Sequence, residues 1–143
     1  MTVQYRHDAI ATFPTTTDTI FQYMSRGGHR HAAFKEHRLV SKDGNLVVID
    51  AEVYNPDGST QAMTIEHRLD PPNGVESRMI GGGFDGARFT HSYTSENGHT
   101  RVDLQGEFPD MPGMSEEDEL AMIDGFFTMA FGEDTETLRT WTP

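Results

Sequence analysis

The last thirty residues, MSEEDELAMIDGFFTMAFGEDTETLRTWTP (114–143), decide how we interpret the whole chain. They predict a long helix that begins after Ser115, because a serine hydroxyl caps a helix and the acids behind it suit the positive end of the helix dipole. Apolar residues then recur at the period of a single helix face: Leu120, Ile123, Phe127, Phe131, Leu138 and Trp141. A helix of about 25 residues must bury that face, and a curved sheet can cover it.

The length and composition limit the class of protein. A chain of 143 residues predicts a single domain, spanning residues 1–143, with one core and room for a modest cavity. Disulfides, thiol catalysis and thiolate metal sites are excluded, because the sequence has no cysteine. No apolar run is long enough to cross a membrane, and MTVQYRHD (1–8) is not a signal peptide, so we expect a cytoplasmic protein.

The charge is strongly negative and unevenly distributed. The net charge is -12, and residues 102–143 carry 11 acids against a single base, Arg139. Such a surface repels phosphate, which argues against a nucleic-acid partner. We expect the acids to form a solvated helix face, with docking to a basic partner as the alternative.

Most of the chain before the helix predicts β-structure. A first strand at Thr2–Phe13 ends at Pro14, and Thr15–Asp18 caps a short helix that carries Ile20, Phe21 and Met24. A second short helix is expected at roughly His29–Glu36. Six strands follow at 37–41, 45–54, 60–69, 75–80, 87–95 and 100–108, separated by turns such as Asp43-Gly44 and Asn97-Gly98. Their short connections require antiparallel neighbours.

This order, with Phe13-Pro14, the segment Asp18-Thr19-Ile20-Phe21 and the final amphipathic helix, resembles the START-like or helix-grip superfamily (SRPBCC). That group includes polyketide cyclases and dehydrases, the birch-pollen allergen family and plant hormone receptors. The resemblance covers essentially the whole chain. It implies an α+β fold in which a seven-stranded antiparallel sheet wraps around the C-terminal helix, with two short helices after the first strand. It also implies a cavity between sheet and helix for a small, largely apolar ligand.

Alternation along the strands sorts the side chains between the two faces of the sheet. The charged faces belong outside, and the apolar faces point toward the helix together with a few polar groups. An unsatisfied polar group there costs about 1–3 kcal/mol, so each is paired internally or kept for a ligand. The candidate ligand contacts are Met63, Ile65, Ser77, Met79, Phe89, Leu104, Phe127 and Phe131.

His67, His91 and Tyr93 are the candidate catalytic residues. The two histidines lie on strands that flank 75–80, so two strand spacings place their backbones about 10 Å apart, on opposite sides of a ligand or a water. In this hypothesis His67 or His91 moves a proton, and Tyr93 or Ser77 polarises a carbonyl group. The alternatives are core histidines satisfied by the backbone or by Tyr93, and metal contact.

His29 and His31, with His37 nearby, form a second histidine cluster that we expect at a solvent-facing helix start. The alternative is that these rings turn inward, above the same cavity mouth as His67 and His91. A zinc site would need an acid or three of His29, His31, His67 and His91 to converge, and their spacing is not a metal signature. We therefore assign no metal and no cofactor. The stretch 81–86, GGGFDG, is a glycine turn or a mobile gate at the cavity entrance, and it lacks the features of a phosphate loop.

Four functions follow as hypotheses. The first is a polyketide cyclase/dehydrase-like enzyme, a lyase-type activity that uses histidine acid/base chemistry. The second is a non-catalytic carrier or sensor of a hydrophobic molecule, and the third is a histidine-dependent metalloenzyme. The fourth is an interaction domain that binds through its acidic helix. The expected partner is a small hydrophobic or aromatic molecule, with neither nucleic acid nor membrane, and a homodimer is compatible with the sequence.

Overall fold

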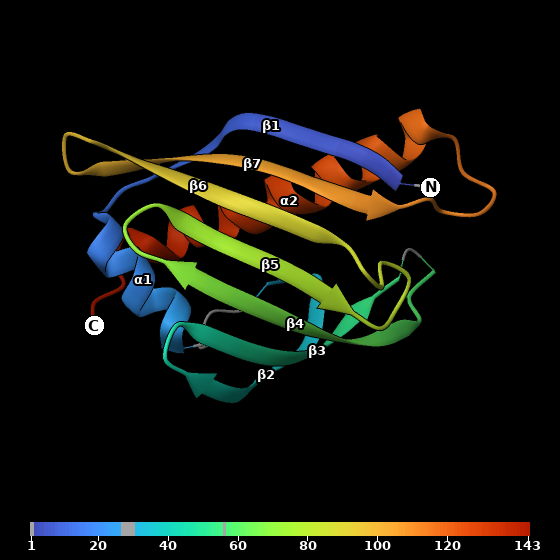
Figure 1. Cartoon of the computed structure of the whole chain (residues 1–143), viewed down its shortest axis with the longest axis horizontal. Coiled ribbons are helices and arrows are strands. Elements are labelled where there is room, and N and C mark those ends of the chain that lie inside the picture. Colours follow the sequence, from blue (N-terminus) through green and yellow to red (C-terminus); the bar gives the residue numbers. More distant parts are fainter. Residues whose placement is uncertain (1, 27–30, 56) are drawn as a thin grey trace.

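The structure is a computed structural model that describes residues 2–26, 31–55 and 57–143. Its two helices and seven strands follow the order β1 (Thr2–Phe13), α1 (Thr17–Arg26), β2 (Phe34–Asp43), β3 (Leu46–Tyr54), β4 (Thr60–Asp70), β5 (Gly74–Ile80), β6 (Arg88–Glu96), β7 (His99–Pro109) and α2 (Glu116–Leu138). This arrangement confirms the expected α+β fold, in which one antiparallel sheet packs against a long C-terminal helix (Figure 1).

The seven strands form a single antiparallel sheet with the order β1-β7-β6-β5-β4-β3-β2. The consecutive hairpins from β2 to β7 therefore lie side by side, and the first strand pairs with the last, from Thr2↔Pro109 to Phe13↔Thr100. The hairpin between β6 and β7 turns through Asn97 and Gly98, whose φ angles are 50° and 81°. Two positive φ angles in succession are what a tight two-residue turn requires, which explains the Asn-Gly pair.

Helix α2 crosses the sheet and buries the apolar stripe that the sequence predicts. Ser115 caps it by accepting a hydrogen bond from the Asp118 N–H at 3.1 Å, and four acids occupy the first turn. Ile123, Phe127, Phe131 and Leu138 are all buried. Because these positions are four or seven residues apart, one face of the helix forms a continuous wall of the core.

Two details differ from the prediction for the helices. Helix α2 ends at Leu138, so Trp141 lies beyond it and packs edge-on against Tyr23 of α1, with ring centroids 5.4 Å apart. The second short helix was wrong where the structure describes it, because Phe34 already begins β2. There the Tyr54 N–H donates to the Ala33 carbonyl at 2.9 Å, so pairing with β3 outweighs the helix propensity of the two alanines. Positions 29 and 30 lie outside the described residues.

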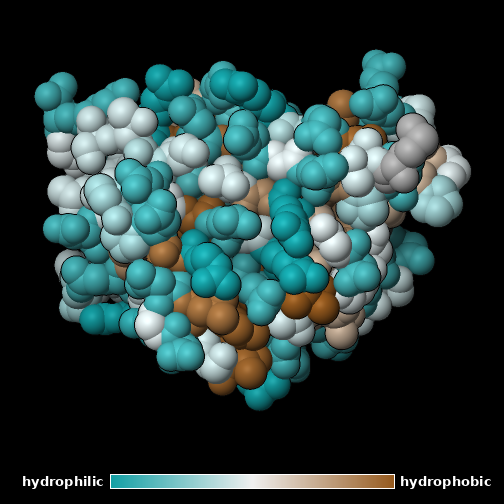
Figure 2. Space-filling model, in the orientation of Figure 1, coloured by the Kyte–Doolittle hydropathy of each residue, from teal (hydrophilic) through white to brown (hydrophobic). Residues whose placement is uncertain are grey.

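The predicted division of faces is confirmed along the central strands. Inward residues of β4 to β7 such as Ile65, Met79, Phe89 and Leu104 are buried, and the registers of these strands run without a bulge. Figure 2 shows the opposite, outer face, where hydrophilic side chains predominate and hydrophobic ones are exposed in places. Within the described residues, no helix has the length and apolar character needed to span a membrane.

Candidate functional site

A cavity of about 70 Å³ lies where α1, the start of β2, the central strands and α2 meet. One water needs about 10–15 Å³ by the same measure, so this space equals about five to seven waters. At about 30 Å³ of liquid volume per water, that is room for about one aromatic ring. The cavity is mainly aromatic, with a small set of polar groups. Its lining residues are Phe13, Ile20, Tyr23, Met24, His31, Phe34, His37, Ile65, His67, Met79, Phe89, His91, Tyr93, Phe126, Phe127, Ala130, Phe131 and Asp134.

The structure brings most of the sequence-predicted site residues to this cavity. Its lining includes all three candidate catalytic residues, namely His67, His91 and Tyr93, and five of the candidate contacts, namely Ile65, Met79, Phe89, Phe127 and Phe131. The remaining candidates, Met63, Ser77 and Leu104, are buried in the core but do not line the cavity. Ser77 nevertheless contacts the site indirectly, through His67.

His67 is held by a hydrogen bond to the neighbouring strand. Its Nδ1 lies 2.7 Å from the hydroxyl of Ser77, which is directly opposite in the β4–β5 register and fully buried. Burial, with a smaller contribution from His37, lowers the pKa of His67 to about 4. The imidazole is therefore neutral at pH 7 and acts there as a hydrogen-bonding group.

His91 and Tyr93 form the second polar pair, on β6. The Tyr93 hydroxyl lies 3.5 Å from His91 Nδ1, and burial raises the pKa of the Tyr93 phenol. Burial, followed by the charge of His67, lowers the pKa of His91 to about 3. Nε2 of His91 is buried without a partner among the described residues, between the stacked ring of Phe89 and the edge-on ring of Phe131. This orphaned nitrogen is the sort of group that a ligand can satisfy.

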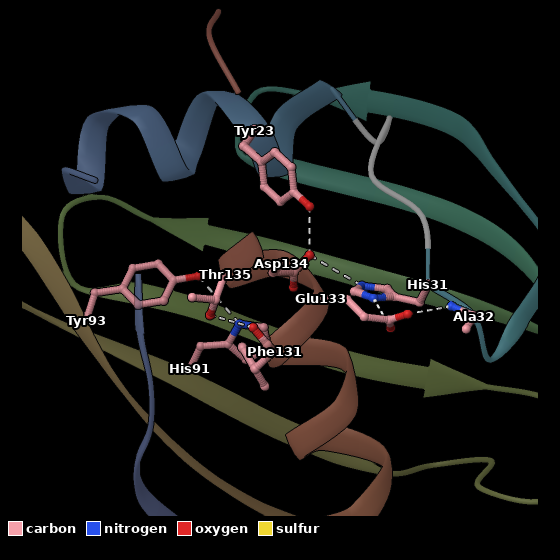
Figure 3. Close-up of polar contacts among 9 residues, drawn as sticks. All are labelled: Tyr23, His31, Ala32, His91, Tyr93, Phe131, Glu133, Asp134 and Thr135. Carbon is pink, nitrogen blue, oxygen red and sulfur yellow. Dashed lines mark hydrogen bonds and ion pairs between the residues drawn. The ribbon is translucent and has the colours of Figure 1, made fainter. Parts of the chain in front are cut away.

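Asp134 of α2, which sequence reasoning missed, brings a carboxyl group into the same cavity (Figure 3). Its Oδ1 accepts a hydrogen bond from the Tyr23 hydroxyl at 2.7 Å and lies 3.5 Å from His31 Nε2. Burial raises the pKa of Asp134 to about 6, against the opposing effects of His31 and Tyr23. A carboxyl group with this pKa can accept and release a proton near neutral pH.

His31 and Glu133 connect the chain after α1 to the end of α2. Glu133 accepts hydrogen bonds from both the His31 ring, at 3.0 Å to Nδ1, and the Ala32 backbone N–H, also at 3.0 Å (Figure 3). His31 is buried, so the prediction that it is solvent-facing was wrong, because these two carboxylates hold it against the helix. His29 lies outside the described residues.

Asp134 carried a signal that the sequence could have revealed. It lies three residues after Phe131 and four before Leu138, in the middle of the buried stripe of α2. An acid at that position either disrupts the core or is kept there by specific partners. By residue type alone, Asp134 instead groups with the acids of the helix that are expected to be solvated.

Neither the metal hypothesis nor the gate hypothesis gains support from the described residues. Across residues 2–26, 31–55 and 57–143, no group of three or more His, Asp or Glu side chains is arranged to hold a metal ion. The glycine-rich loop at 81–86 does not line the cavity. Phe84 packs there against Phe108, with centroids 5.7 Å apart, and Asp85 accepts the Gly81 N–H at 2.7 Å, so the loop closes on itself and on the core.

Comparison with known proteins supports the fold. No family model matches the chain, and no curated protein is similar in sequence. Among solved structures, Ara h 8.0201 matches with a TM-score of 0.74 and 13% identity, covering 99% of this chain and 100% of that one. The Zhui aromatase/cyclase from Streptomyces sp. R1128 matches with a TM-score of 0.70 and 11% identity, covering 96% of this chain and 92% of that one.

A third similar structure is StfQ, a di-domain aromatase/cyclase from the steffimycin biosynthetic pathway. Its TM-score is 0.65 at 13% identity, over 94% of this chain and 52% of that one, so the chain spans about half the length of the di-domain protein. Identities this low show the fold alone. The chain therefore has a helix-grip fold, as its sequence predicts.

Proposed function

We propose that this protein binds a compact, largely apolar molecule in the cavity and catalyses acid–base chemistry on it, as a cyclase or dehydratase. The observation that carries the proposal is the position of Asp134, a buried carboxyl group in the wall of an aromatic cavity that also contains two neutral histidines. A buried acid destabilises a folded protein unless it is compensated, so its retention in a cavity favours a functional role. The aromatase/cyclases among the similar structures support the same class of reaction.

In the proposed reaction, ionised Asp134 removes a proton from the carbon next to a carbonyl group. An N–H of His67 or His91 stabilises the negative charge that develops on the carbonyl oxygen. A hydroxyl group on the next carbon then leaves as water, taking back the proton from Asp134, and a carbon–carbon double bond forms. The histidines, with pKa values of about 4 and 3, are hydrogen-bond partners in this scheme, and the proton transfer belongs to Asp134.

A non-catalytic carrier is the second candidate. The low pKa values of His67 and His91 favour it to the extent that neutral histidines hold a ligand without exchanging protons with it. A carrier and an enzyme would use the same cavity and the same contacts, so turnover distinguishes them.

The test uses 4-hydroxy-4-phenylbutan-2-one, a one-ring β-hydroxyketone whose dehydration gives a strongly absorbing conjugated ketone. The enzyme proposal expects protein-dependent formation of this product, lost in Asp134→Asn and kept in His99→Phe, a control at an exposed histidine of the β6–β7 hairpin. Binding without turnover would favour the carrier. If the protein neither bound nor dehydrated this ketone, the proposal would be contradicted.

A further inference from the structure

The buried hydroxyl of Ser77 has no role in the reaction described above, although it lies directly behind the site. Ser77 is fully buried, does not line the cavity, and has His67 Nδ1 as its hydrogen-bonding side-chain partner at 2.7 Å. Ser77 lies at an inward position of β5 between the buried apolar residues Val75 and Met79, so packing alone does not explain a serine there. Its hydrogen bond fixes the side of the His67 imidazole that carries the proton.

Counting hydrogens assigns the tautomer of His67. A serine hydroxyl has one hydrogen, and a neutral imidazole has one N–H. If Nδ1–H donated to Ser77, the serine hydrogen would be left without an acceptor among the described residues. If Ser77 donates to Nδ1, the serine hydrogen has its acceptor and the imidazole proton resides on Nε2, on the side of the ring away from Ser77. A hydrogen left on Ser77, outside the cavity lining, could reach no ligand, whereas one on Nε2 of the lining residue His67 can, so the second arrangement is favoured.

The same logic applies to His91. The Tyr93 hydroxyl, 3.5 Å from Nδ1 of His91, remains protonated because burial raises its pKa. Donation from the phenol to Nδ1 leaves the proton on Nε2 of His91, the nitrogen that has no partner within the described part of the chain. The hydroxyl groups of Ser77 and Tyr93 thus place the proton of each imidazole on Nε2.

The charges around the cavity also limit the charge that a ligand can carry. The cavity's described lining includes no lysine or arginine, whereas Asp134 belongs to it and Glu133 is the preceding residue of the helix. The whole chain has a net charge of -12. A carboxylate entering this space would lose its hydration among aromatic rings and meet charges of its own sign.

We propose that Ser77 and Tyr93 hold His67 and His91 in their Nε2–H tautomers, so that the cavity takes a neutral carbonyl compound of about one ring and rejects carboxylates. This inference rests on the proposed function in that it assumes a ligand in this cavity. It adds the property that selects the ligand, which is a hydrogen-bond acceptor without a negative charge.

The tautomers can be observed without any ligand. Protein labelled with ¹⁵N-histidine, studied by long-range ¹H–¹⁵N correlation at pH 7, should show His67 and His91 protonated at Nε2 and unprotonated at Nδ1. Ser77→Ala should shift His67 toward a mixture of tautomers, whereas Ser92→Ala, at an exposed serine of β6, should leave it unchanged. An Nδ1–H tautomer of His67 in the unaltered protein would overturn the proposal.

The ligand class is tested with three probes of similar size: acetophenone, ethylbenzene and benzoate. In NMR titrations, acetophenone should bind about two- to tenfold more tightly than ethylbenzene, because it gains one neutral hydrogen bond. Benzoate should bind most weakly of the three. Ser77→Ala should reduce the advantage of acetophenone and leave ethylbenzene unaffected. Equal affinities for acetophenone and ethylbenzene would overturn the proposed ligand class but not the proposal that the cavity binds a ligand. Failure of all three to bind would overturn both this inference and the proposed function.

Discussion

Two aspartates of helix α2, ten residues apart, have the same kinds of partner in different surroundings. Asp124 accepts a hydrogen bond from the Tyr5 hydroxyl at 2.8 Å and lies 2.7 Å from His7 Nδ1. Asp134 accepts one from the Tyr23 hydroxyl at 2.7 Å and lies 3.5 Å from His31 Nε2. Each carboxyl group therefore connects α2 to a tyrosine and a histidine from other elements.

The two aspartates differ in how far their side chains are exposed to solvent. The side chain of Asp124 is 46% exposed, and its hydrogen bonds, first that from Tyr5, lower its pKa. The side chain of Asp134 is 11% exposed, and burial raises its pKa to about 6. The same kinds of partner thus surround a largely exposed carboxyl group with a lowered pKa at one site and a buried one with a raised pKa at the other. Solvent access, more than the partners, determines which role a carboxyl group takes.

The largest expected effect is on catalysis. Asp134→Asn should lower the dehydration rate of 4-hydroxy-4-phenylbutan-2-one by at least about a hundredfold, because a positioned general base contributes about 10²–10⁴. Asp124→Asn should leave that rate within about a factor of two, since Asp124 is outside the cavity lining. Equal losses in the two variants would contradict the distinction between the sites.

Stability should respond in the opposite sense. The raised pKa of Asp134 means that its ionisation opposes folding, with no effect below its ordinary pKa of 3.8 and the full effect above about pH 6. Asp134→Asn should therefore raise the free energy of unfolding at pH 7 by about 1–3 kcal/mol, and by much less at pH 4. Urea denaturation at both pH values measures this, and a loss of stability at pH 7 would count against it.

Asp124→Asn provides the matched comparison for stability. The lowered pKa of Asp124 stabilises the fold above pH 4, and this contribution is lost as the pH falls through its folded-state value. Because the group is largely exposed, the variant should lose only about 0.5 kcal/mol at pH 7 after allowance for solvent screening. A gain in stability would show that ionised Asp124 does not stabilise the fold.

The pH dependence of turnover gives a third contrast. Activity should rise with pH through a midpoint near 6, because the ionised form of Asp134 is the base. The rate at pH 5 should thus be about tenfold below that at pH 7. A profile that is flat between pH 5 and 7 in kcat/KM would remove Asp134 from the proton-transfer role.

The smallest effect concerns the two tyrosines. Tyr23→Phe should move the midpoint of the pH profile upward, because the hydrogen bond from Tyr23 helps hold the pKa of Asp134 down. Tyr5→Phe should leave the midpoint unchanged, although each variant loses one hydrogen bond worth about 1 kcal/mol. The pair of profiles, measured side by side, tests whether the inner carboxyl group alone is coupled to turnover.

Much of the fold was predictable because local rules and burial agree along the chain. Asn97-Gly98 specifies a tight hairpin, Ser115 specifies a helix start, and unbroken alternation in β4 to β7 specifies which residues face inward. The exception was the segment that begins β2. There Ala32 and Ala33 favour a helix locally, and only the pairing partner in β3, distant in sequence, decides for a strand.

The polar groups of the site were predictable only on the sheet side, although the helix period also brought Phe127 and Phe131 to the cavity. Period-two alternation brings His67, His91 and Tyr93 to the inner face whatever the details of packing. On the helix side, residue type did not separate Asp134 from the other acids of α2, which are mostly solvated. Recognising it requires the position of the residue within the apolar stripe rather than its type.

The most direct test of the central claim is a ¹³C NMR titration of the aspartate carboxyl carbons in the unaltered protein. The account predicts that Asp134 titrates near pH 6 and Asp124 below its ordinary range of about 4. Assignment through Asp134→Asn and Asp124→Asn identifies the two resonances. If Asp134 titrated at or below pH 4, it would be a second structural clamp, and the proposed acid–base role would be contradicted.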